Sequence, residues 1–166
     1  MRRRLLALFL DYCVVLGWFG VLAAVFVPLH LAGFKLWSAH VDLVAFVGSV
    51  LPVWLYLILT ESGAARATWG KRRAGLQVLG VGRERPHRVR IGVRNAVKLL
   101  PWQFAHFGVA PLLAGDGSET LVSPSAAWSP ITAAYALLGL ALAAVLIRAD
   151  RAAPHDLVAG TRVGVA

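Results

Sequence analysis

The sequence predicts an all-α membrane protein, a small polytopic bundle of about four transmembrane or membrane-embedded helices joined by a basic cytoplasmic loop. Its 166 residues are 58% hydrophobic with a mean hydropathy of +0.69, more apolar than an ordinary soluble domain. Apolar runs long enough to cross a bilayer recur along the chain. Basic residues gather between these runs and give a formal net charge of +9. The length suits one domain, so we expect a single transmembrane domain over residues 1–166.

The first expected span covers about residues 5–31 and contains a carboxylate, Asp11. The basic start resembles a signal peptide, but the apolar run exceeds the roughly 7–15 residues of such a segment, so we expect a retained signal anchor. Arg4 and Asp11 are close to two helical turns apart, so both project from one face about 10 Å apart. An acid in lipid costs roughly 2.5–3.5 kcal/mol on insertion-based scales, so Asp11 needs a partner.

The second expected span covers about residues 41–60. Pro52 predicts a kink inside it, because proline removes a helical hydrogen bond. Near its start, His30, His40 and Asp42 suggest metal ligation by residue type alone. Their spacing fits no metal-ligand template, so we expect no metal site there.

Residues 64–98 form a basic segment with ten Lys or Arg and one acid, Glu84. Within it, Thr68 is expected to cap a short helix whose N-terminal amides are open to an anion. Residues 76–81, with a return near residues 87–90, predict a small hairpin at the membrane surface. The glycine spacing matches neither a P-loop nor a dinucleotide-binding fingerprint.

The third apolar stretch, residues 91–114, is ambiguous because it carries Arg94 and Lys98 on one helix face. It could be a polar-faced span, a re-entrant segment or an interfacial helix. The last expected span covers about residues 128–147, and the loop at residues 115–129 before it contains no Lys or Arg.

The distribution of charge favours four crossings. With a cytoplasmic N-terminus, four crossings place 16 of the 17 basic residues on the inner side. Three crossings would leave the arginines of the C-terminal tail outside, against the positive-inside rule. We therefore expect a multi-pass protein of the plasma (inner) membrane with both termini in the cytoplasm.

Under this topology we expect an ion-pair network that closes the inner face. The cations within reach of Asp11 in a packed bundle would be Lys71, Arg94 and Lys98. Asp156, which follows the last span, would meet Arg4 or a basic residue of the 66–73 segment. Such a network would tie distant spans together, or a carboxylate beside His155 or His106 could bind a cation or relay protons.

The basic segment indicates contact with anionic lipid headgroups, at roughly 1 kcal/mol per charge near the surface. An acidic partner protein or an anionic ligand is the alternative, and nucleic acid is not expected because no recognition module is present. No nucleophile–base pair, paired carboxylates or metal template stands out. We therefore expect no enzymatic activity, no catalytic residues and no cofactor.

Three motifs occur in order: Arg4-x-x-Ala7-x-x-x-Asp11, Thr68-x-Gly70-Lys71-x-x-x-Gly75-Leu76-x-Val78, and His155-Asp156-x-x-Ala159-Gly160-Thr161-x-Val163. Together they resemble the RDD family of integral membrane proteins, named for one arginine and two aspartates. By this resemblance Arg4, Asp11 and Asp156 are those three residues, although a proline often stands where this chain has Trp69. The resemblance implies a multi-helix membrane protein, with cation/proton antiport proposed for some members and organisation of membrane protein complexes for others.

We therefore expect transport of a small cation or proton coupled to the intramembrane Asp11. The alternative is a non-catalytic scaffold or assembly factor for a membrane protein complex. A carrier of this length is expected to form a homo-oligomer, whereas a scaffold would hold a membrane protein partner. The candidate residues of the motifs and the charge network are Arg4, Asp11, Thr68, Gly70, Lys71, Gly75, Arg94, His155, Asp156, Gly160 and Thr161.

Overall fold

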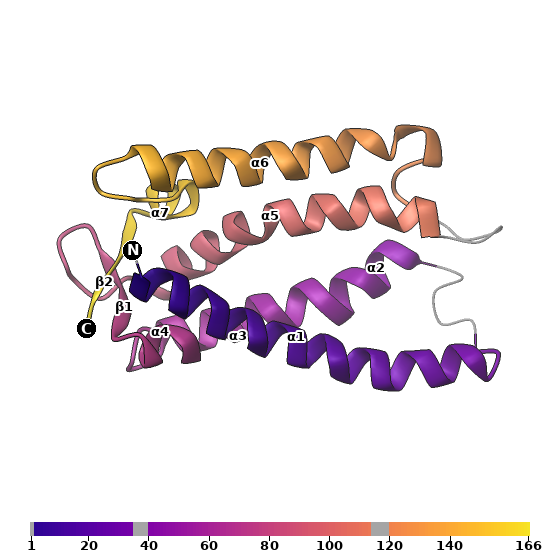
Figure 1. The fold of residues 1–166 in the computed structure, drawn as a ribbon, viewed down its shortest axis with the longest axis horizontal. Coiled ribbons are helices and arrows are strands. Elements are labelled where there is room, and N and C mark those ends of the chain that lie inside the picture. Colours follow the sequence, from indigo (N-terminus) through magenta and orange to yellow (C-terminus); the bar gives the residue numbers. More distant parts are fainter. Residues whose placement is uncertain (1, 35–39, 114–119) are drawn as a thin grey trace. The chain divides into compact units, whose positions relative to one another are not determined.

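The computed structural model describes residues 2–34, 40–113 and 120–166, and most of them are helical (Figure 1). The helical elements are α1 (Arg2–Leu31), α2 (Val41–Ala45), the π-helical turn η1 (Phe46–Val50), α3 (Leu51–Ser62), α4 (Trp69–Arg73), α5 (Arg88–Leu113), the 3-10 turn η2 (Pro124–Ala126), α6 (Trp128–Ile147) and α7 (Pro154–Ala159). The strands are β1 (Leu76–Gly80) and β2 (Thr161–Val165). The predicted helical fold class is confirmed.

Within the described ranges, three helical segments are long and apolar enough to cross a membrane: Arg2–Leu31, Val41–Ser62 and Pro124–Ile147. They correspond to the first, second and last expected spans. The third expected stretch is the 26-residue helix α5, which begins at Arg88. The charged residues in its first half make it more polar than the other three, so composition alone does not mark it as a span.

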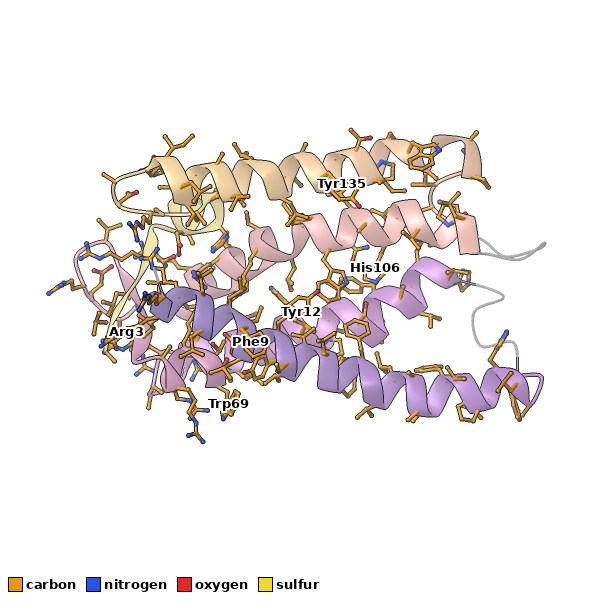
Figure 2. All side chains as sticks on the ribbon, viewed as in Figure 1. Arg3, Phe9, Tyr12, Trp69, His106 and Tyr135 are labelled. Atoms are coloured by element: carbon orange, nitrogen blue, oxygen red, sulfur yellow. The ribbon has the colours of Figure 1, made fainter. Side chains whose placement is uncertain are left out.

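Large apolar side chains project outward along these helices (Figure 2). Phe9 on α1 is 65% exposed, and Tyr135 on α6 is 72% exposed. Exposure of this kind along a whole helix is unfavourable in water but suits contact with lipid tails. The pattern is therefore that of membrane-embedded helices.

The irregularity predicted at Pro52 takes the form of the π-helical turn η1, which ends two residues before it. Proline has no N–H to donate to the carbonyl of Gly48, four residues earlier. The indole N–H of Trp18 donates to that carbonyl at 2.9 Å. The backbone oxygen therefore keeps a donor where the helix ladder is interrupted.

The chain divides into two compact units. The first contains Met1–Gly17, Val53–Lys98 and Leu140–Ala166. The second contains Trp18–Pro52 and Leu99–Gly139. Every candidate residue of the motifs and the charge network lies in the first unit.

In the first unit, β1 pairs antiparallel with β2, with Val78 opposite Val163 (Figure 1). The prediction that residues 76–81 form a hairpin with a return near residues 87–90 is therefore wrong. Residues 88–90 already belong to α5, so they cannot form a return strand. The sheet instead joins the middle of the chain to its C-terminal end. Leu76 of β1 packs with the buried side chains of Ala7 and Ala74, and Val163 of β2 packs against this cluster.

Candidate functional site

Glu61, near the end of α3, is the centre of the site, and its side chain is fully buried. Lys71 Nζ donates to its Oε1 at 2.5 Å, and Arg94 Nη1 donates to its Oε2 at 2.6 Å. The Asn95 amide donates to the same Oε2 at 3.0 Å. Burial of a carboxylate is costly unless it is paired and hydrogen-bonded, and these donors provide both forms of compensation.

Arg94 extends the cluster to the C-terminal segment. Its side chain is 2% exposed, and its Nε donates to Asp156 Oδ1 at 2.9 Å. The Thr161 hydroxyl donates to the same oxygen at 3.1 Å, and His155 Nε2 lies 3.7 Å from Asp156 Oδ2. We call the series Lys71–Glu61–Arg94–Asp156 the buried ion-pair chain; it joins α4, α3, α5 and α7.

Asp11, on α1, is held differently. The Thr68 hydroxyl donates to its Oδ2 at 2.5 Å, and the Gly70 N–H donates to its Oδ1 at 2.8 Å. Thr68 Oγ1 also accepts from the Lys71 N–H at 3.4 Å, so the predicted helix cap at Thr68 is confirmed. The anion that meets the N-terminal amides of α4 is therefore the chain's own Asp11 carboxylate.

The packing around Gly70 explains the glycine of the second motif. A Cβ atom at this position would lie 2.7 Å from Asp11 Oδ1 and closer still to the Ala7 carbonyl oxygen. These contacts are shorter than van der Waals separation, and one of them is to backbone. A side chain at residue 70 would therefore force α4 away from α1.

The prediction that a cation contacts Asp11 directly is wrong. Of the expected partners, Lys71 and Arg94 form their ion pairs with Glu61. Lys98 interacts with Asp11 electrostatically but donates no hydrogen bond to it within the described chain. The reason is local: α4 presents a hydroxyl and an amide N–H to the carboxylate, which satisfy it without an ion pair.

The predicted pairing of Asp156 with Arg4 or the 66–73 segment is also wrong. Arg4 does reach the C-terminal region, but it donates to the backbone carbonyls of Arg151 at 2.9 Å and Val163 at 2.8 Å. A guanidinium has five N–H donors in a fork, which suits two carbonyl groups as well as one carboxylate. Arg4 therefore anchors α1 to the C-terminal segment, and Asp156 forms its ion pair with Arg94 instead.

Two glycines of the motifs adopt left-handed backbone conformations, Gly75 with φ +66° and Gly160 with φ +58°. Gly160 ends α7 as its C-cap, a position that favours glycine because it has no Cβ. Arg90 donates to the carbonyl oxygens of Ala159, at 2.8 Å, and Gly160. The end of α7 is thus tied to the start of α5.

His155 lies outside the spanning helices, and its pKa is lowered from the ordinary value of about 6.5. Burial is the main cause, and the positive charge of Arg94 adds to it, against the opposing effect of Asp156. Its imidazole is therefore neutral at neutral pH. Among exposed groups, the hydrogen bond from Arg148 lowers the pKa of Asp150 to about 2.

Glu61, which forms ion pairs with both Lys71 and Arg94, was not among the site residues predicted from the sequence. The signal that identified Asp11 was a carboxylate inside a long apolar run, and Glu61 directly follows the apolar run at residues 41–60. Asn95 and Arg90 carried no such signal. Their roles depend on contacts between segments far apart in sequence.

The family comparison agrees with the three motifs. The model of the RDD family matches residues 1–160, which include Arg4, Asp11 and Asp156. Neither a curated protein nor a solved structure shows significant similarity to the chain. Since the match covers nearly the whole sequence and the helices are apolar enough to span a membrane, the chain belongs to the RDD family of membrane proteins.

Proposed function

We propose that the chain transports a small monovalent cation or a proton, with Asp11 as the exchanging carboxylate. The observation that supports this proposal is the contrast between the half-buried Asp11 and the two buried acids of the first unit, Glu61 and Asp156. Glu61 and Asp156 are paired directly with Arg94, whose charge is permanent at physiological pH. Asp11 is held by the neutral donors of Thr68 and Gly70.

This contrast matters because a carboxylate in a direct pair with arginine resists both protonation and cation binding. The hydroxyl of Thr68 and the amide N–H of Gly70 carry no full charge, so the negative charge of Asp11 has no directly bonded cation among the described residues. Asp11 is also only half-buried, so it can exchange an ion with its surroundings. In this proposal the buried ion-pair chain holds the helices in place and Asp11 performs the exchange.

The basic surface of the first unit supports contact with anionic headgroups of an inner membrane, with both termini in the cytoplasm. Its exposed arginines include Arg2, Arg3, Arg72, Arg73, Arg83, Arg85 and Arg88. Trp69 projects outward (Figure 2), and the Arg73 guanidinium lies 5.6 Å from its ring centroid. Tryptophan and arginine side chains together favour the membrane interface.

Reconstituted flux tests the proposal. The full chain in proteoliposomes should show Na⁺, K⁺ or Li⁺ flux driven by a pH gradient, and Asp11→Asn should abolish it. Asp150→Asn is the matched control, since it removes an exposed acid that pairs with Arg148. The absence of flux from the wild-type protein would overturn the transport function, and full flux from a folded Asp11→Asn variant would overturn the role of Asp11.

The second candidate function is a non-catalytic scaffold or assembly factor, and the exposed arginines favour it. Such a surface suits an acidic membrane protein partner, or a second copy that presents acidic groups. Crosslinking in native membranes distinguishes the two functions. A scaffold should give defined crosslinks that Arg72→Gln with Arg73→Gln removes, while cation flux stays at the level of empty vesicles.

A further inference from the structure

The second unit contains a cavity of about 540 Å³ between the start of the second span and α5. Asp42 and Phe46 line it from one side, and Gln103 and Phe107 line it from α5. Most of the lining is apolar, and the volume lies in the range of small-molecule sites in proteins. None of these residues belongs to the charge network of the first unit.

Two buried oxygen atoms of this cavity wall lack hydrogen-bond partners within the described ranges, Asp42 Oδ1 and Gln103 Oε1. The other oxygen of Asp42, Oδ2, accepts from the Leu121 N–H at 2.6 Å, which fixes the carboxylate in place. Asp42 is only 7% exposed. A buried oxygen atom without a hydrogen-bond donor is unfavourable, so the carboxylate oxygen of Asp42 and the amide oxygen of Gln103 indicate a missing donor. Because Asp42 carries a negative charge, a cationic donor would satisfy it best.

We propose that this cavity binds a primary ammonium group attached to an apolar body. Asp42 would supply the countercharge, and Asp42 Oδ1 and Gln103 Oε1 would accept N–H donors. The rings of Phe46 and Phe107 would contact the apolar body and attract the cation. A bare metal ion fits less well, because it needs a shell of several oxygen atoms and the cavity is wide and largely apolar.

A primary ammonium can come from a soluble amine or from the headgroup of an ethanolamine lipid. Both present the same N–H donors, but only the soluble amine brings an apolar body into the cavity. The lipid brings the two-carbon ethanolamine link, and its acyl chains stay in the bilayer. The lipid source fits the position of Asp42, which lies in the first turn of a helical segment apolar enough to span a membrane. The experiment therefore needs an arm for each source. The inference is independent of the proposed transport function, since it concerns a different unit of the chain.

The test is calorimetric titration of the full chain in phosphatidylcholine nanodiscs with 2-phenylethylammonium. We expect saturable binding that Asp42→Asn weakens at least tenfold, because the substitution removes the charge and keeps the shape. Gln103→Leu should weaken binding several-fold and serves as the second variant if Asp42→Asn does not fold. Asp150→Asn removes an acid of the first unit and should bind like the wild type.

The neutral analogue 2-phenylethanol should not displace the ammonium. Nanodiscs that contain phosphatidylethanolamine should weaken binding if the lipid headgroup is the occupant, and unchanged affinity there assigns the cavity to soluble amines. The proposal is overturned if the wild type does not bind the ammonium, if the alcohol binds equally well, or if folded Asp42→Asn and Gln103→Leu both bind like the wild type.

Discussion

The Glu61 carboxylate and the Arg94 guanidinium, 2.6 Å apart and both almost fully buried, join the end of α3 to the first half of α5. Arg94 also binds Asp156, and Glu61 also binds Lys71. Each charge therefore has partners on two sides. Removal of one member leaves the next charge buried and incompletely paired, which is the most costly outcome for such groups.

The first prediction concerns Glu61→Gln. The amide keeps the shape but removes the charge that neutralises Lys71 and Arg94, so the free energy of unfolding should fall by about 3–5 kcal/mol. Thermal unfolding in detergent, followed by circular dichroism, measures the change. Glu84→Gln is the control, because Glu84 is an exposed acid whose ion pair with Arg90 is open to solvent, and it should change stability little. If Glu61→Gln were as stable as the wild type, the buried ion-pair chain would not stabilise the protein.

The second prediction concerns Gly70→Ala. The added methyl group meets Asp11 and the Ala7 backbone, so overpacking should destabilise the protein by about 1–3 kcal/mol. Gly17→Ala is the matched control on α1, since no described atom other than those of adjacent residues and the local helix backbone lies within 4 Å of a Cβ there. Melting temperatures of the two variants in the same detergent give the comparison. If Gly17→Ala lowered stability as much as Gly70→Ala, the steric explanation would fail.

The third prediction concerns the Thr68 hydroxyl, which donates to Asp11 and accepts from the Lys71 N–H. Thr68→Val keeps the shape but leaves a carboxylate oxygen without its donor, at a cost of about 1–3 kcal/mol. Thr68→Ser retains the hydroxyl and should stay closer to the wild type. Urea or thermal unfolding of both variants measures the difference, and a valine variant as stable as the serine variant would argue against this bond.

The fourth prediction concerns pH. His155 has a lowered pKa in the folded state, so the unfolded state binds its proton more readily. The neutral imidazole of His155 therefore contributes to the stability of the folded state. This contribution is fully present above about pH 6.5, the ordinary histidine pKa, and is lost as the pH falls below that value. The charged groups that face His155 are Arg94, Lys98, Glu61 and Asp156.

His155→Gln should therefore make the melting temperature less dependent on pH between about 6.5 and 5. Melting curves over this interval check the effect. The exposed His87 provides the control, since His87→Gln should leave the wild-type pH dependence unchanged. If the melting temperature of His155→Gln fell at acid pH as steeply as that of the wild type, a group other than His155 would cause the pH dependence.

How far the site could be predicted differs from residue to residue. The cap at Thr68 was predictable, because capping depends on residues three positions apart. The need of Asp11 for a partner was predictable from its place in an apolar run. The identity of that partner was not, because Lys71, Arg94 and Lys98 were equally plausible in sequence. The choice between them depends on distances of a few ångströms between separate helices.

The sequence by itself determined the long helices, the short helix capped by Thr68, the positions of the apolar spans, the irregularity at Pro52 and the family, because hydropathy, capping and proline geometry are local properties. Only the tertiary structure decided that β1 pairs with β2, that Arg94 binds Glu61 and Asp156, and that Arg4 binds carbonyl groups. The physical reason is that each of these contacts joins residues far apart in the chain. Several donors could satisfy each buried acid, and the packing of the backbone selects which donor reaches it.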